Sequence, residues 1–94
     1  MNCERIVLSG HALQRIFERG LSVDDVRSVL CDGEEISSYP DDTPYPSCVM
    51  LGFMEGRAVH VVVAQEENTR TCYVITVYRP NPDLWESDFK RRRP

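Results

Sequence analysis

The sequence predicts one α+β domain over residues 1–94, in which two N-terminal helices pack on a four-stranded antiparallel sheet and a short C-terminal helix follows. Hydrophobic residues recur at the helical period over residues 10–31. They alternate at period two over residues 34–78, and turn-forming residues separate the expected strands. A chain of 94 residues is long enough for one two-layer core and too short for a second.

The first helix is expected from Gly10 to Arg19, and Gly20 ends it in the left-handed conformation that favours glycine. On a helical projection its large hydrophobic residues gather on one side, which we expect to face the sheet: Leu13, Ile16 and Phe17. The second helix begins after the N-cap residue Ser22, with Asp25 as the partner in a capping box.

Four segments have the composition of strands, and they hold residues 35–39, 48–54, 57–64 and 71–78. Glu55-Gly56 is expected to form the hairpin turn between the second and third of them. Ile6-Val7-Leu8 is also strand-like. Residues 83–94 are expected to form the C-terminal helix, anchored by Trp85, and a basic tail.

Alternation assigns side chains of the last two strands to opposite faces of the sheet. Two hydrophobic sets are expected to face the helices: Val59, Val61 and Val63 from one strand, and Tyr73, Ile75 and Val77 from the other. His60, Thr76 and Tyr78 then share the open face, with His60 opposite Thr76 or Tyr78.

Three cationic side chains, His11, Arg15 and Arg19, fall within an arc of about 80° on the first helix. With His60, Thr76 and Tyr78 they form the candidate catalytic site. Histidines and arginines without metal ligands suit metal-independent RNA cleavage. We expect His11 to be the base that takes the 2′-hydroxyl proton, because the helix N-terminus and the arginines favour its neutral form. His60 would be the acid that protonates the leaving oxygen.

The same residues also have structural interpretations. The basic side chains fit an ordinary solvated face, in which Arg15 pairs with Glu18. A single histidine in a strand is commonly a hydrogen-bonded structural residue, and Thr76 and Tyr78 fit strand propensity. No cofactor and no metal is expected, since too few possible ligands cluster for a metal hydrolase.

The four cysteines, Cys3, Cys31, Cys48 and Cys72, are widely spaced, and no C-x-x-C pair occurs. We expect mostly buried, reduced thiols, with disulfides and metal binding as the alternatives. No membrane span or secretory leader is expected, so the predicted location is the cytoplasm.

A net charge of −4 argues against a generic polyanion binder, so that any RNA-facing surface must be local. The only dense basic cluster is the tail Lys90, Arg91, Arg92 and Arg93. These four residues are the candidate phosphate contacts outside the catalytic site, and a frayed, solvated terminus is the alternative.

Five stretches of the chain carry spaced motifs: Ser9-x-His11-Ala12-x-x-Arg15-x-x-x-Arg19-Gly20-Leu21-Ser22-x-x-Asp25-Val26, Leu51-Gly52, His60-Val61-Val62, Val74-Ile75-Thr76-Val77-Tyr78-x-Pro80 and Trp85-x-x-Asp88-Phe89. In these motifs, which cover nearly the whole chain, the protein resembles the bacterial family called domain of unknown function 4258.

That family resembles the RelE, ParE and BrnT toxins. The Arg19-Gly20-Leu21-Ser22 corner is similar to the corner of BrnT, and Ile75 to Arg79 match its last conserved strand. The resemblance implies a RelE-like fold (the barnase/EndoU/colicin/RelE type) and an RNA-cleaving or ribosome-directed activity. Those toxins are usually basic, and this chain is acidic.

The sequence therefore predicts a metal-independent, toxin-like endoribonuclease, with RNA and a cognate antitoxin as expected partners. The alternative is a non-catalytic module of the same fold that binds a protein or RNA.

Overall fold

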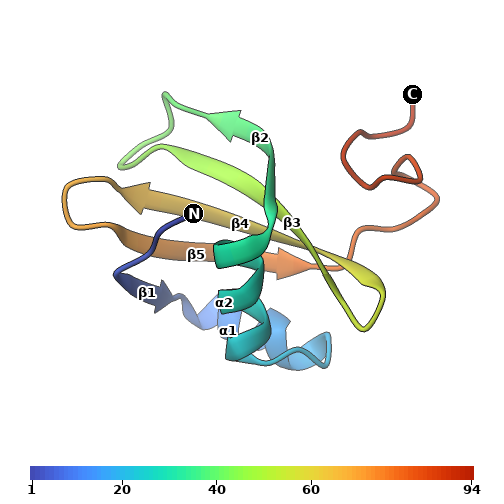
Figure 1. Cartoon of the computed structure of the whole chain (residues 1–94), viewed down its shortest axis with the longest axis horizontal. Helices are drawn as coiled ribbons and strands as arrows, with labels where there is room; N and C mark the ends of the chain where they lie inside the picture. The colour runs from blue at the N-terminus through green and yellow to red at the C-terminus, as the bar shows by residue number, and fades with distance from the viewer.

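The computed structural model describes residues 1–94, which form two helices on one side of a five-stranded sheet (Figure 1). In chain order the elements are β1 (Arg5–Leu8), α1 (Gly10–Glu18), α2 (Val23–Asp32), β2 (Glu34–Tyr39), β3 (Ser47–Met54), β4 (Arg57–Glu66) and β5 (Thr71–Tyr78). The strands are ordered β1-β5-β4-β3-β2.

The prediction of four antiparallel strands is wrong, because β1 adds a fifth strand that runs parallel to β5. Its register pairs Arg5 with Thr71 and Leu8 with Val74. The other neighbours in the sheet are antiparallel. β1 has only four residues, and what makes them a strand is the free edge of β5, which lies 66 residues away in the sequence.

The predicted C-terminal helix is absent, and residues 80–94 form turns and a hairpin-like loop instead. The backbone amides of Glu86 and Arg93 donate to the carbonyls of Arg91 and Leu84. Phe89 has a φ of 60°, which interrupts any helix. The segment leaves the end of β5 and lies at the opposite end of the sheet from the β4–β5 turn (Figure 1).

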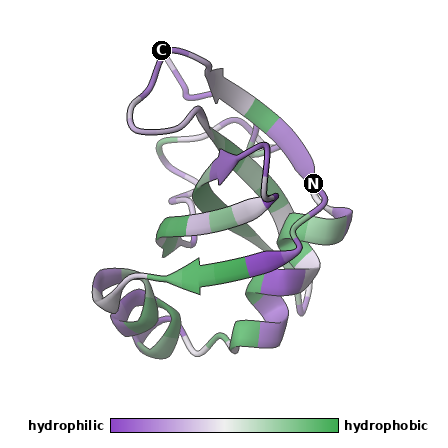
Figure 2. Ribbon diagram, turned by 90° about the vertical axis from the view of Figure 1, so that its left-hand side faces the viewer, coloured by the Kyte–Doolittle hydropathy of each residue, from purple (hydrophilic) through white to green (hydrophobic).

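Both helices begin where the sequence predicts, α1 at Gly10 and α2 after its predicted cap Ser22. The Ser9 hydroxyl accepts a hydrogen bond from the amide of Ala12, and Ser22 and Asp25 form the complete capping box of α2. Hydrophobic and hydrophilic residues alternate in bands along the helices (Figure 2), as in helices buried on one side.

The side of α1 predicted to be buried is only partly right. Ile16 is buried together with Ala12, whereas 47% of Leu13 and 86% of Phe17 is exposed. The reason is the position of α1, which packs mainly on β5 near one side of the sheet, while α2 packs on β3 and β4. A helix with one neighbour buries only a narrow stripe.

A β-bulge in β5 changes the predicted faces of that strand. Val62 pairs with Thr76 and Val63 pairs with Val74, so Ile75 has no partner of its own on β4. Val74 and Val77 therefore both join the core, together with the predicted set Val59, Val61 and Val63. Ile75, predicted to face the helices, is 43% exposed.

Two of the four cysteines form a disulfide, which contradicts the prediction of reduced thiols. Cys3 precedes β1 and is bonded to Cys72 of β5, across a sequence separation of 69 residues. The parallel pairing of β1 with β5 brings the two together. Cys31 and Cys48 are free, and burial raises the pKa of Cys48 to about 12. Neither helix is long and apolar enough to cross a membrane.

Candidate functional site

The start of α1 is attached to the edge of β5. β1 ends opposite Val74, so the following residues of β5 have no strand beside them on that edge. The Ser9 hydroxyl, which caps α1, donates to the carbonyl of Ile75 at 3.5 Å. In the first turn of the helix, Nε2 of the exposed His11 lies 3.1 Å from Oγ1 of Thr76. The structure thus joins two of the predicted site residues, 65 positions apart, by a hydrogen bond.

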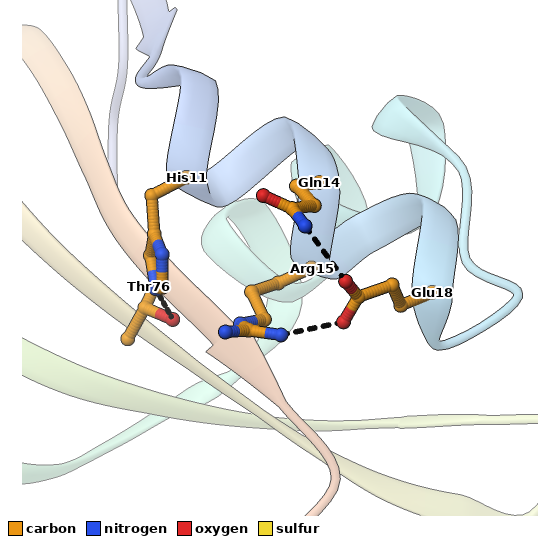
Figure 3. A network of polar contacts seen from close by, with 5 residues as sticks. All are labelled: His11, Gln14, Arg15, Glu18 and Thr76. Carbon is orange, nitrogen blue, oxygen red and sulfur yellow. Dashed lines mark hydrogen bonds and ion pairs between the residues drawn. The ribbon is translucent and has the colours of Figure 1, made fainter.

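Arg15 lies on the same side of α1 as His11, one turn further along (Figure 3). Its guanidinium forms an ion pair with Glu18, which also accepts a hydrogen bond from Gln14 at 3.0 Å. The hydrogen bond from Arg15 lowers the pKa of Glu18. Arg19 is the exposed C-cap of the helix. We call the surface formed by His11, Arg15 and Arg19 the basic flank, and Glu18 offsets part of its charge.

His60 pairs with Tyr78, one of the two registers expected from the sequence. The ring is fully buried and both nitrogens are bonded: Nε2 lies 2.8 Å from the carbonyl of Phe89 and Nδ1 lies 3.1 Å from the Tyr78 hydroxyl. A carbonyl only accepts, so Nε2 carries the proton, and the neutral ring accepts the Tyr78 hydrogen at Nδ1. Burial lowers the pKa of His60, which favours this neutral form.

The C-terminal segment covers His60 on the face away from the helices. The Trp85 ring packs edge-on against the imidazole, with 4.5 Å between centroids. Tyr78 is half-buried beside it, and burial raises the pKa of its hydroxyl. An acid that protonates a leaving group needs a proton that is free to transfer, and it must contact the substrate. The single proton of neutral His60 is donated to the Phe89 carbonyl, and the ring is buried, so His60 meets neither condition in this structure.

The site residues predicted from the sequence therefore form two groups on one face of β5. Thr76 and Tyr78 are two positions apart, opposite Val62 and His60. His11 bonds Thr76 at the edge of the sheet, and His60 bonds Tyr78 under the C-terminal segment. Only the first group is open to solvent, because His11 is exposed and His60 is not.

A cleft beside Thr76 was missed by the sequence analysis. It has a volume of about 680 Å³ and lies between the loop after β2 and the open face, where Tyr39, Asp41, Val62 and Ile75 line it. The bulge at Ile75 turns this side chain into the cleft wall. The unbroken hydrophobic run from Tyr73 to Ile75, which does not alternate, is the one sequence signal of a change of face.

Three of the four basic residues of the tail have intramolecular partners. Lys90 forms an ion pair with Glu34 at 3.1 Å, and Arg93 forms one with Glu86 at 3.7 Å. The Arg92 guanidinium lies over the Trp85 ring, 5.7 Å from its centroid. The tail is folded against the sheet, and its side chains remain partly exposed.

No three His, Cys, Asp or Glu side chains gather in a way that could hold a metal ion. The polar groups that the site offers are therefore imidazole, guanidinium, hydroxyl and the carboxylates of Glu18 and Asp41. Such groups bind anions and transfer protons.

The family model described as Domain of unknown function (DUF4258) matches residues 8–79, which include both helices, β2 to β5 and the basic flank. No curated protein and no solved structure matches the chain.

Proposed function

We propose, from the premise that the chain belongs to the DUF4258 family of domains of unknown function, that the protein binds RNA by gripping its phosphates with the basic flank of α1. The observation that carries this proposal is the common orientation of His11 and Arg15 beside Thr76 (Figure 3). Residues four positions apart rise about 6 Å along a helix, so the imidazole of His11 and the guanidiniums of Arg15 and Arg19 form a row along one side of α1.

Local charge carries the interaction in this proposal, because the net charge of the chain is −4. Glu18 pairs with Arg15 in the free protein, and an RNA phosphate would take its place. The resemblance of the Arg19-Gly20-Leu21-Ser22 corner to RNA-cleaving toxins favours RNA among the polyanions. A cytoplasmic location and a cognate antitoxin belong to the same proposal, although disulfides such as Cys3–Cys72 are rare in that reducing compartment.

Replacing Arg15 and Arg19 together by alanine is expected to weaken binding of a single-stranded oligoribonucleotide. Each lost phosphate contact flattens the slope of log affinity against log salt by about 0.7 for a single strand. Glu18→Gln is expected to strengthen binding, because it frees Arg15 from its partner. Fluorescence anisotropy over a series of salt concentrations measures both effects.

Arg27→Ala is the matched control, because Arg27 is exposed on α2 and belongs to none of the ion pairs. It removes one positive charge at another place, so its effect is compared with that of each single variant, Arg15→Ala and Arg19→Ala. Equal weakening by Arg27→Ala would refute a specific role of the basic flank, and so would an unchanged affinity in the double variant.

The second candidate is metal-independent RNA cleavage with His11 as the base, and its support is the exposed imidazole held at Nε2 by Thr76. His11 would take the 2′-hydroxyl proton, the 2′-oxygen would attack the phosphorus, and the 5′-oxygen would leave with a proton from water. The products are a 2′,3′-cyclic phosphate and a 5′-hydroxyl. Arg15 and Arg19 would stabilise the crowded phosphate.

His11→Ala is then expected to reduce the rate of cleavage by about 100- to 10,000-fold, the usual contribution of a positioned base. The affinity for RNA should change by no more than a few fold. Thr76→Val removes the hydrogen bond that orients the ring and should alter the pH profile of cleavage. Gel analysis of a defined oligoribonucleotide, with and without a chelator, provides the measurement. Cleavage that survives in His11→Ala, or that the chelator abolishes, would leave binding as the function.

A further inference from the structure

A small cavity lies between the β3–β4 turn and the segment that follows β5. Its volume is about 190 Å³, and its lining includes Arg57, Arg79, Pro80 and Pro82. No acidic residue lines it. It is separate from the basic flank, none of whose residues takes part in it.

Arg79 has two guanidinium nitrogens, Nε and Nη1, that are buried and have no hydrogen-bond partner. The chain has 15 acidic residues, yet neither Arg79 nor Arg57 belongs to any of the four ion pairs. An unpaired buried donor is costly, and an unpaired buried cation more so. Buried groups of this kind are rare in folded proteins, and a bound water, a bound ion or a functional role accounts for them.

The cavity lies between a tight turn and a segment that contains two prolines. Gly56 has a φ of +74° in the β3–β4 turn, next to Arg57. On the other side Pro80 is buried, and Pro80 and Pro82 each have a restricted backbone. The half-buried Arg79 needs little further ordering when the cavity takes up an anion, whereas the exposed Arg57 side chain is ordered on binding.

We propose that Arg57 and Arg79 form a binding site for a phosphate group. Two guanidiniums supply two positive charges and forked donors that match a tetrahedral oxyanion. A water molecule occupies about 30 Å³ in the liquid, so the cavity has room for a group of a few heavy atoms. The ligand is a free phosphate ion or one phosphate of a larger molecule whose remaining part stays outside.

Inorganic phosphate is expected to raise the melting temperature of the wild-type protein by several degrees relative to chloride at the same ionic strength, since a ligand that binds only the folded state stabilises it. In Arg79→Gln the shift should vanish. Without phosphate this variant should melt above the wild type, because it lacks the unpaired buried charge. Arg57→Gln should need at least about tenfold more phosphate for the same shift, the effect of one lost charged hydrogen bond.

Arg27→Gln is the control for net charge and should behave as the wild type. The site would be refuted if phosphate did not raise the melting temperature of the wild type. It would also be refuted if phosphate raised the melting temperatures of Arg79→Gln and Arg57→Gln as much as that of the wild type. Should Arg79→Gln fail to fold, the Arg57→Gln titration decides by itself.

A short oligoribonucleotide in place of phosphate separates the two sources. If the oligoribonucleotide raises the melting temperature through Arg79 at a lower concentration than inorganic phosphate does, the site binds an RNA phosphate. If only inorganic phosphate raises the melting temperature, the site binds the free ion. The double variant of Arg15 and Arg19 should keep the phosphate-induced shift. The proposal for the cavity and the proposal for the basic flank are therefore tested independently of each other.

Discussion

Replacing Cys3 by serine is expected to lower the free energy of unfolding by about 4 kcal/mol, the chain-entropy value for a disulfide that closes a loop of roughly 70 residues. The Cys3–Cys72 bond spans 69 positions and ties the N-terminus to β5. A domain of this size typically has about 5–15 kcal/mol of total stability, so the loss removes a large part of it. Urea denaturation monitored by circular dichroism provides the measurement.

Serine at Cys3 leaves Cys72, which is fully buried in the core, as an intact thiol. Cys31→Ser is the matched control, because Cys31 is free and exposed, and it should change stability by less than about 0.5 kcal/mol. Thiol labelling of the denatured wild type, without a reductant, should find two reactive cysteines. Adding a reductant should lower the stability of the wild type to that of Cys3→Ser. Four reactive thiols and equal stability of both proteins would contradict the disulfide.

Replacing His60 by alanine is expected to cost about 3 kcal/mol, by the size of effects seen when a buried side chain and its hydrogen bonds are removed. The change leaves a cavity beside Trp85 and Tyr78, and it leaves the carbonyl of Phe89 without its donor. The C-terminal segment should detach as a consequence. Faster proteolysis after residue 80 would report that detachment.

The pH dependence of stability distinguishes a buried neutral histidine from an exposed one. Burial lowers the pKa of His60 in the folded state, so below the ordinary value of 6.5 the unfolded chain binds more protons. The contribution of neutral His60 to the free energy of unfolding is therefore complete above pH 6.5, and it falls as the pH drops from there toward the folded-state pKa. His60→Gln should remove this part of the pH dependence, and His11→Gln should retain it. Equal slopes in the wild type and His60→Gln would mean that His60 titrates normally when folded.

Local signals in the sequence predicted the elements that depend on local interactions. The caps at Ser22 and Asp25 act within one helical turn, and both are present in the structure. The hairpin at Glu55-Gly56 pairs adjacent strands, and Gly56 has the positive φ that the turn requires. Alternation placed His60 opposite Thr76 or Tyr78, and the bulge between Val62 and Val63 is what shifts the register so that Tyr78 is the partner.

The sequence was a poor guide wherever an element depended on distant neighbours. The sheet edge that accepts β1 belongs to residues 71–74, and no local pattern identifies it. The bulge at Ile75 interrupts the alternation of β5, so that Val74 joins the correctly predicted Val77 in the core, although plain counting puts these two side chains on opposite faces. No sequence pattern identifies Arg79 as a site residue, since only tertiary packing buries its guanidinium nitrogens.

The candidate site divides along the same line. By itself the sequence determined the row of His11, Arg15 and Arg19, because helical periodicity sets which side chains share a flank. It also determined that His60 and Tyr78 share a face of the sheet. Only the tertiary structure decided that His11 stays open to solvent while Trp85 and Phe89 cover His60. Exposure depends on chain segments that arrive from 25 or more positions away, and periodicity within one element contains no information about them.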